Sequence, residues 1–580
     1  MQQAVYLDAF EEMLAQVDRP ASCSGPICFR RRSLACCPDT IELEIVSLDK
    51  APAYEALSYA WGSADLVCEF TCGSKVLPVT RSCFDALKRT QPPCQIDTKI
   101  RNSPASEDRD RPSSVCRAPP RILWIDGICI DQSSLQERSQ QVRLMADIYM
   151  KATTVLLWPG PDLPRSQIFF GSDQVADEIQ EAFELLSSPY FSRIWPVQEV
   201  ALSRECIVLN NQGGFYRLPD VLAGTRRIHS RWPEDQTKHP YMIVRQASLL
   251  RRMWLYFEHI RCNTGNPHAA IGSIASISRI LLDARKLKSS EPRDKIFAIQ
   301  GMLKIIGVDL SPPDYTRTIA SIYTEAAAVA MKHDKALNIL SGVTGVQTHI
   351  AVPSWVPDWS DSTCISEILP WEESSATGKS SANHSFTLNE TVMSSYGIAI
   401  DVIEVVLHEF ADAESVGYND VFDASDNLIR DLRELIAGKN MVPSETCLEI
   451  LCTLSFAAWS TTRHKYPLKG VVRRLMGEVR TTKMGKHLYE TILQVRDILV
   501  QRLDRKILFK TREGRTGLAS KHALAGDSIV LLAGCNLPMI IRSTGDDSWR
   551  IVAPAYVHGE GIMQGDLWDD EADLVNFKII

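Results

Sequence analysis

Residues 123–160 read LWIDGICIDQSSLQERSQQVRLMADIYMKATTVLLWPG, and this stretch decides the fold. The almost entirely apolar run 122–130, in which Asp126 is the first charge, is typical of a strand buried on both faces of a sheet. Apolar residues then recur at helical spacing over 135–152, which predicts a helix with one buried face. Residues 153–160 predict a second buried strand. This order is typical of an α/β fold with a parallel sheet and right-handed crossovers.

The flanking sequence continues the same alternation of strands and helices. The predicted elements are strands at 41–48, 55–62 and 205–210, a hairpin at 69–79, and helices at 82–90, 175–188 and 194–203. Ser134 and Glu137 form a capping-box pattern at the start of the central helix. Ligands of parallel sheets bind at the carboxyl ends of the strands. We therefore expect Trp61, Gly62 and Asp126 near one rim of the sheet.

The rest of the chain differs in composition and in periodicity. Six prolines and many charges mark 91–120 as a flexible insertion. Short alternating runs near the end predict a small β-barrel or β-sheet. The predicted organisation is an N-terminal segment 1–40, an α/β domain 41–215, a mainly helical region 216–370, a mixed and then helical region 371–505, and a β-rich region 506–580.

Composition limits the classes of partner. A net charge of −8 and a pI of about 5.9 argue against nucleic acid as the main partner. No apolar run has the roughly 18 residues that a membrane span needs. The first residues lack the basic start of a signal peptide, so we expect a cytoplasmic protein with reduced thiols. Cys23, Cys28, Cys36 and Cys37 match no common zinc spacing, so no metal is predicted.

Three blocks carry a family resemblance: YEALSYAWG at 54–62, the stretch 123–160, and PYFSRIWPVQEVALS at 189–203. In this order they resemble the fungal heterokaryon incompatibility (HET) domain. Segments further along, such as EPRDKIFAIQGM at 291–302 and PSWVPDWS at 353–360, resemble sequences that follow this domain in many fungal proteins. The resemblance implies a TIR-like or flavodoxin-like parallel sheet over 41–215, followed by a mainly helical region and a small β-rich region.

The resemblance also implies a chemistry. HET domains are regarded as distant relatives of TIR domains, and TIR enzymes cleave the nicotinamide–ribose bond of NAD with a glutamate that lies four residues after a tryptophan. Trp195 and Glu199 have this spacing, and residues i and i+4 project from the same face of a helix. Glu199 is therefore the candidate catalytic residue, and Trp195 is a candidate for stacking on the substrate.

The candidate substrate-binding residues around this pair follow from their chemistry. Asp126 supplies a second carboxylate, and Arg193 suits a phosphate. The opposing wall is assigned to Tyr59, Trp61 and Gly62, since glycine permits a close approach of the backbone. NAD enters as a substrate, and no cofactor is predicted.

Structural roles for the same residues stay open. Glu199 alternatively pairs with Arg193 or Arg204, the two tryptophans pack in a core, and Asp126 caps a turn. At the level of function, the family resemblance implies non-self recognition between fungal cells followed by programmed cell death, with a protein partner and with a homo-oligomer left open. The alternative is a non-catalytic module that assembles with a partner protein.

Overall fold

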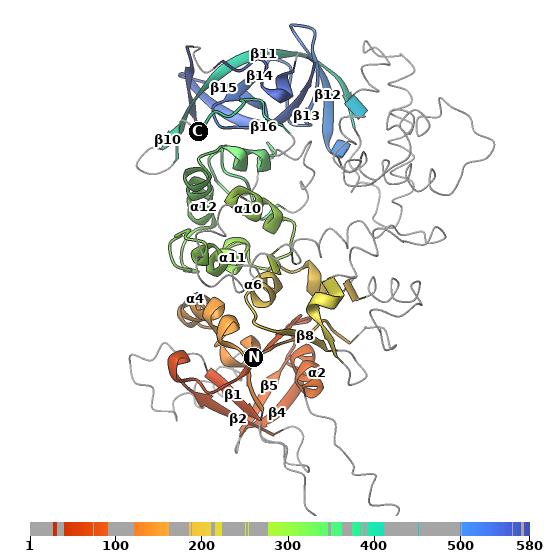
Figure 1. Ribbon diagram of the computed structural model, residues 1–580, viewed down its shortest axis with the longest axis vertical. Helices are drawn as coiled ribbons and strands as arrows, with labels where there is room; N and C mark the ends of the chain where they lie inside the picture. The colour runs from red at the N-terminus through yellow and green to blue at the C-terminus, as the bar shows by residue number, and fades with distance from the viewer. Residues whose placement is uncertain are drawn as a thin grey trace, which may run out of the picture. The chain divides into compact units, whose positions relative to one another are not determined.

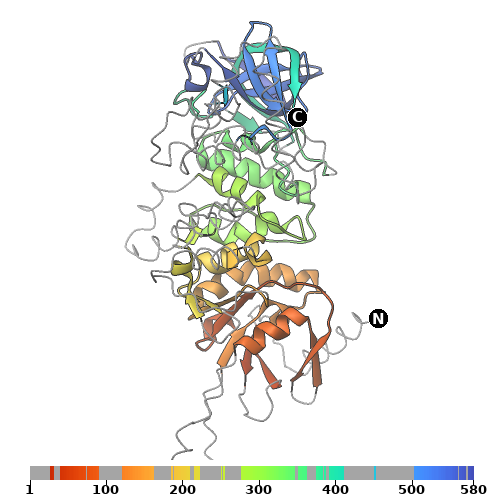
Figure 2. The same ribbon diagram turned by 90° about the vertical axis from the view of Figure 1, so that its right-hand side faces the viewer.

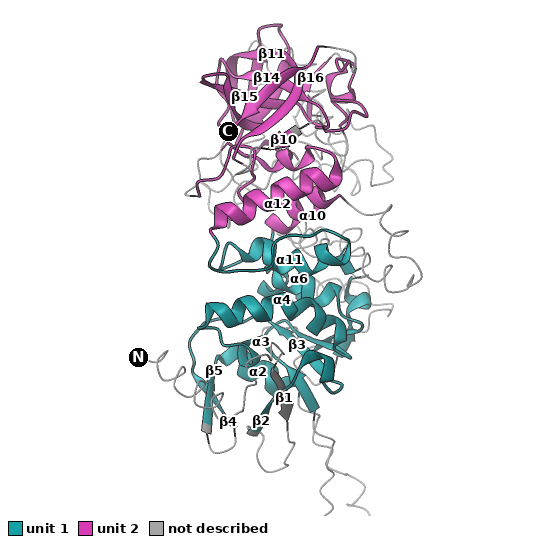
Figure 3. Ribbon diagram, turned by 90° about the vertical axis from the view of Figure 1, so that its left-hand side faces the viewer, with its two compact units in different colours: residues 1–274, 287–317 teal, residues 275–286, 318–580 magenta. Residues whose placement is uncertain are grey.

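The chain forms two compact units in a computed structural model (Figures 1 and 3). Unit 1 contains Met1–Ile274 and Leu287–Arg317, and unit 2 contains Ala275–Lys286 and Thr318–Ile580. The structure describes residues 27–31, 40–72, 75–90, 121–161, 185–186, 188–209, 215–222, 250, 253–254, 276–345, 350–361, 374–382, 384–386, 391–410, 450–451, 499, 502–559, 561–569 and 573–580. The predicted flexible insertion 91–120, most of the predicted helix 175–188 and nearly all of 411–501 lie outside the described residues.

Unit 1 is built on a nine-stranded sheet of order β5-β4-β2-β1-β6-β3-β7-β8-β9. Four consecutive strands of this sheet, β6, β3, β7 and β8, run parallel to one another, as predicted. Strands β1, β5 and β9 pair antiparallel with their neighbours. The strands are β1 Ile27–Arg31, β2 Thr40–Ile45, β3 Glu55–Tyr59, β4 Cys68–Cys72, β5 Lys75–Val79, β6 Arg121–Trp124, β7 Val155–Trp158, β8 Cys206–Leu209 and β9 Phe215–Arg217.

Two details of the predicted sheet are wrong. Residues 27–31, which we placed in an N-terminal segment outside the α/β domain, form β1 between β2 and β6. The run 122–130 is not one strand, because β6 ends at Trp124 and α3 (Asp126–Cys129) follows at once. Asp126 is the first residue of α3, where a negative charge is favourable, and its carboxylate accepts a hydrogen bond from the Gly127 amide.

The helices of unit 1 lie in layers on the sheet. Helix α6 (Trp195–Ala201) contacts β3 and α4 (Leu135–Lys151), and α11 (Asp294–Ile305) packs on both of these helices (Figure 3). Helix α2 (Arg81–Arg89) contacts β3 and β4. One half of the predicted capping box is present, since Ser134 accepts from the Glu137 amide, whereas the Glu137 carboxylate accepts from the Asp131 amide. Pro196 occupies the first turn of α6, where its missing N–H leaves no gap in the helix.

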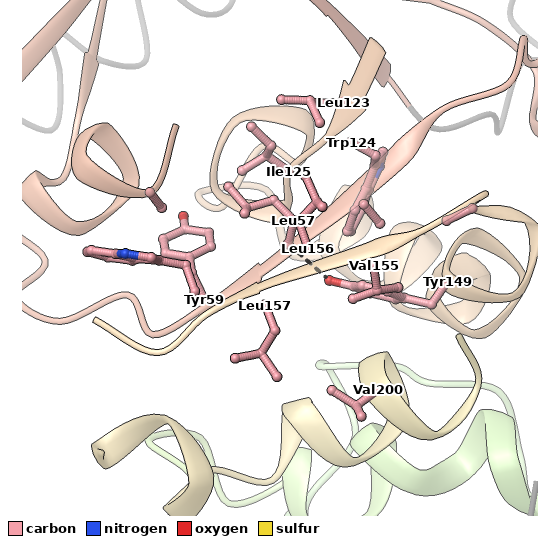
Figure 4. Packing of buried hydrophobic residues seen from close by; sticks show 14 of the residues in the cluster. Leu57, Tyr59, Leu123, Trp124, Ile125, Tyr149, Val155, Leu156, Leu157 and Val200 are labelled. Carbon is pink, nitrogen blue, oxygen red and sulfur yellow. Dashed lines mark hydrogen bonds between the residues drawn. The ribbon is translucent and has the colours of Figure 1, made fainter. Parts of the chain in front are cut away.

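The core of unit 1 lies between the sheet and these helices (Figure 4). Trp124 and Tyr149 are fully buried and meet edge to face with ring centroids 5.5 Å apart. Leu157 of β7 and Val200 of α6 belong to the same cluster. Helix α6 is therefore fixed on the sheet by apolar burial, which sets the position of every polar side chain that it carries.

Unit 2 combines helices with a β-barrel (Figure 2). Helices α10 (Ile277–Arg285) and α12 (Ile319–Asp334) and the 3-10 helix η4 (Asn338–Gly342) pack together. The strands are β10 His384–Phe386, β11 Met393–Glu409, β12 Lys506–Thr511, β13 Thr516–Ser520, β14 Ser528–Leu532, β15 Met539–Gly545, β16 Ser548–His558 and β17 Val575–Ile579. Six of them form a ring, β11-β12-β13-β16-β15-β14, which closes because β14 also pairs with β11.

Closure of the ring depends on the 17-residue strand β11, whose two halves pair with different neighbours. The first half pairs with β14 and β17, and the second half pairs with β12. Of the two alternatives for the C-terminal region, the structure has the barrel. Among the described residues, no helix has the length and apolarity to cross a membrane.

Gly397→Ala in β11 is expected to destabilise unit 2. A Cβ at Gly397 would lie 2.1 Å from the Leu531 carbonyl oxygen of β14, so the methyl group must push the two strands apart at about 1–3 kcal/mol. Thermal unfolding followed by circular dichroism measures the loss. Ala399→Ser, at an exposed position of the same strand, is the control, and equal midpoints for the two variants contradict the prediction.

Candidate functional site

Glu199 is a buried carboxyl group at the interface between α6 and the sheet. Only 4% of the residue is exposed. The Ser58 hydroxyl of β3 donates a hydrogen bond to Glu199 Oε2. The Tyr190 hydroxyl lies 2.6 Å from Ser58 Oγ. Because a serine hydroxyl has one proton to donate, Tyr190 donates to Ser58 and Ser58 donates to Glu199.

The surroundings of Glu199 disfavour its charge. Burial, and then the neighbouring charge of Asp126, raise the pKa of Glu199 to about 8, against the opposing effects of the Ser58 hydrogen bond and of positive Arg193. The Tyr149 hydroxyl, 3.5 Å from the Leu57 carbonyl oxygen, also favours the ionised form (Figure 4). A carboxyl group with this pKa exchanges its proton near neutral pH, as general acids and bases do.

Asp126 lies beside Glu199 and is half-buried at the end of β6. Trp61 Nε1 donates to Asp126 Oδ2 at 2.8 Å, and the Gly127 amide donates to Oδ1 at 2.7 Å. Burial raises the pKa of Asp126, and these hydrogen bonds and Arg193 oppose the rise. The negative charge of Asp126 in turn disfavours ionisation of the neighbouring Glu199.

The other residues that were predicted to line the substrate site differ in their exposure to solvent. Tyr59 is buried in the core, and a Cβ at Gly127 would lie 2.5 Å from its hydroxyl, so only glycine fits there. Arg193 is half-buried, and its Nη1 donates to the Tyr59 carbonyl oxygen at 2.9 Å. Gly62 is exposed and has a φ of +65°, a conformation that favours glycine.

Trp195 makes its polar contact with α11, whereas Glu199 bonds to β3. Its Nε1 donates to Asp294 Oδ2 of α11 at 3.0 Å, and the Tyr315 hydroxyl donates to Asp294 Oδ1 at 2.6 Å. Burial raises the pKa of Asp294 to about 6, and these two hydrogen bonds oppose the rise. The indole N–H of Trp195, a residue predicted to stack on the substrate, thus donates to a carboxylate of the protein itself.

The structure brings together Glu199, Asp126, Arg193, Tyr59 and Trp61 at the carboxyl ends of β3 and β6. Residues that the sequence reasoning missed complete the cluster: Ser58, Tyr149 and Tyr190. It also missed Asp294 of α11, which contacts Trp195 outside this cluster. Ser58 had a signal, because it is a small polar residue within the otherwise apolar or aromatic buried part of the strand Glu55–Tyr59. Arg204, one proposed ion-pair partner of Glu199, donates instead to the Met150 carbonyl oxygen.

Several other side chains that could carry chemistry have structural roles instead. The Glu137 carboxylate accepts from the Asp131 amide at 3.2 Å, which is a structural role. Cys129 is buried, as expected of an inert thiol. The six cysteines whose side chains are described are all free thiols. Within the described ranges, no three histidine, cysteine, aspartate or glutamate side chains gather as ligands for a metal ion.

Comparison with known families agrees with this architecture. Residues 54–199, which span β3 to Glu199, match the family described as heterokaryon incompatibility protein (HET). This part of the chain is therefore similar to a HET domain. Residues 477–579 match the Het-6 beta-barrel domain, so β11, the strand that closes the barrel, lies before the matched range.

One relative aligns with this chain along nearly the whole length of both proteins. It is heterokaryon incompatibility protein 6, OR allele, of Neurospora crassa, which is 23% identical over 678 aligned residues that cover 97% of this chain and 95% of that protein. No solved structure matches the chain. The HET match ends at Glu199, and Leu287–Arg317, which completes unit 1, lies beyond it.

Proposed function

We propose that this HET protein acts in heterokaryon incompatibility, with the HET domain as the part that triggers cell death in the cytoplasm after recognition of a protein partner. The HET family match and the Neurospora relative support the incompatibility role. The barrel and the helices of unit 2 are then the regions available for recognition or control.

For the HET domain we propose NAD glycohydrolase activity with Glu199 as the catalytic residue. The observation that carries the proposal is the buried Glu199 carboxyl group, which has a pKa of about 8 and lies next to Asp126 at the strand ends. Buried carboxyl groups with strongly shifted pKa values are concentrated at functional sites. The carboxyl ends of parallel strands are also where such sheets bind ligands.

The chemistry suits an ionised Glu199. Departure of nicotinamide with the electron pair of the C1′–N bond leaves an oxocarbenium-like ribosyl cation, as in glycoside hydrolysis. A carboxylate aimed at this cation stabilises the charge that develops. Water then adds to C1′ and releases a proton, which gives ADP-ribose and nicotinamide. The half-buried Asp126, Trp61 and Arg193 and the exposed Gly62 form the side from which NAD would enter.

The proposal predicts a specific pH dependence for nicotinamide release by the purified full chain. The value of kcat/KM reports ionisations of the free enzyme. Because Glu199 must be ionised and its pKa is about 8, kcat/KM is expected to rise about tenfold for each pH unit below 8 and then to level off. No release of nicotinamide at any pH between 6 and 9 contradicts the proposal.

A non-catalytic assembly module is the second candidate, because the same burial of Glu199 also suits a carboxyl group with a structural role. With 4% exposure and a hydrogen bond from Ser58, the carboxyl group is equally suited to a structural role. Overexpression in a fungal host separates the two functions. Cell death that persists with Glu199→Gln favours assembly, and death lost together with NAD cleavage favours the enzyme.

A further inference from the structure

The helix that carries Glu199 is attached to a segment beyond the HET match. The bond between Trp195 Nε1 and Asp294 joins α6 to α11. Two backbone hydrogen bonds run beside it: the Ile194 amide donates to the Lys288 carbonyl oxygen at 3.0 Å, and the Lys288 amide donates to Ser192 at 2.6 Å. The start of α6 is therefore held by Leu287–Arg317 through both backbone and side chains.

The same segment is anchored to α4 by an independent set of contacts. The Arg138 guanidinium lies over the Tyr315 ring, 4.3 Å from the centroid, and Tyr315 donates to Asp294. The Tyr315 amide donates to Ser139 Oγ at 3.2 Å, and Arg143 Nε donates to the Pro313 carbonyl oxygen at 3.1 Å. Residues of α4 therefore hold Tyr315, and Tyr315 in turn holds the Asp294 carboxylate that accepts the bond from Trp195.

The helices also approach too closely for a larger side chain. A Cβ at Gly301 of α11 would lie 2.4 Å from the Ala146 Cβ of α4 and 2.6 Å from Gln198 Oε1 of α6. Gln198 precedes Glu199 and is 1% exposed. A shift of α11 would therefore move α6, because packed interiors transmit displacements.

We infer that Asp294 is a positioning residue, which acts through the indole N–H of Trp195 to hold α6 so that Glu199 faces the strand ends. The inference rests on the proposed catalytic role of Glu199 and assigns Trp195 a different task from substrate stacking. The functional unit then comprises the HET domain together with Leu287–Arg317. A displacement of about 1 Å at a catalytic group lowers the rate by up to about 100-fold.

The test uses the full chain with Asp294→Ala, Trp195→Phe and the double variant, and it measures NAD cleavage. A positioning role predicts that each variant lowers kcat roughly 10–100-fold with KM unchanged, and that the double variant is no worse than either single one. Asp294→Asn keeps an oxygen for the indole and an amide for Tyr315, so it is expected to stay nearer wild type. A higher KM in Trp195→Phe alone, with Asp294→Ala unaffected, overturns the inference in favour of stacking on the substrate.

A measurement without NAD separates this inference from the proposed function. Hydrogen exchange of the amides in Trp195–Ala201 is expected to accelerate in both single variants and no further in the double variant. Glu55→Ala is the control, because Glu55 is also a hydrogen-bonded carboxylate of unit 1. It is bonded to Arg121 at 2.7 Å and lies at the start of β3, away from Ser58. If the wild type cleaves no NAD, the proposed function fails, and the exchange data still decide the coupling. Unchanged exchange in α6, or equal changes with Glu55→Ala, overturns it.

Discussion

Glu199→Gln is expected to lower NAD cleavage by the full chain roughly 1,000-fold while the protein stays folded. Glutamine has the shape of the carboxyl group, and its side-chain oxygen can still accept the Ser58 hydrogen bond. It cannot become negative, so the charge that would stabilise the ribosyl cation is lost. The neighbouring Asp126 does not replace it, because it projects from another element and is engaged by Trp61 and the Gly127 amide.

Steady-state assays of nicotinamide release measure this loss, and circular dichroism establishes that the variant is folded. Glu55→Gln is the control, because it also replaces one carboxylate by an amide. Glu55 lies at the start of β3, at the end of the strand away from the candidate site. Activity within a few-fold of wild type in Glu199→Gln would assign the buried carboxyl group to structure alone.

The second large effect is on the pH dependence of stability. The pKa of Glu199 is about 8 in the folded chain, above its ordinary value of 4.5. A raised folded pKa stabilises the protein fully below pH 4.5, and this contribution disappears as the pH rises through 8. The loss is on the order of 3–5 kcal/mol, because each pKa unit corresponds to about 1.4 kcal/mol. The wild type should weaken over this window, and Glu199→Gln should weaken much less.

Urea unfolding of the two proteins at several pH values measures the difference. Asp126 and Asp294 also have raised pKa values, but they are present in both proteins, so their contributions largely cancel in the comparison. The advantage of Glu199→Gln over wild type is expected to grow with pH and to level off above pH 8. A constant difference from pH 4 to pH 9 would show that the folded protein does not perturb the Glu199 carboxyl group.

The sequence predicts the parallel centre of the HET sheet because burial leaves a local record there. A strand covered on both faces is apolar throughout, as Val155–Trp158 is, and a helix on a sheet shows one apolar face, as Leu135–Lys151 does. Strand β1 leaves no such record, since Ile27–Arg31 contains two arginines and does not alternate. The end of β6 was misplaced because apolar residues continue through the buried turn at Ile128 and Cys129.

The candidate site was only partly predictable, for a related reason. Glu199 and Trp195 share a helix, so their spacing in sequence carries information about their geometry. The bonds that decide what these side chains do join residues that are far apart: Ser58 is 141 positions from Glu199, and Asp294 is 99 positions from Trp195. The spacing of apolar residues along the chain indicates which residues are buried, but it does not indicate which distant residue each of them contacts.

The closed barrel has a consequence for how this protein can diversify. Strands β11 and β12 are neighbours in the ring, with Glu409 paired to Ile507 and the Phe410 amide bonded to the Lys506 carbonyl oxygen at 2.9 Å. The connection between these two strands therefore begins and ends at adjacent points of the ring. Its length can change while the register of the ring is preserved, because each doubling of a loop's length costs only about 0.6 kcal/mol. The barrel therefore permits insertions and deletions between β11 and β12 at a small cost in stability.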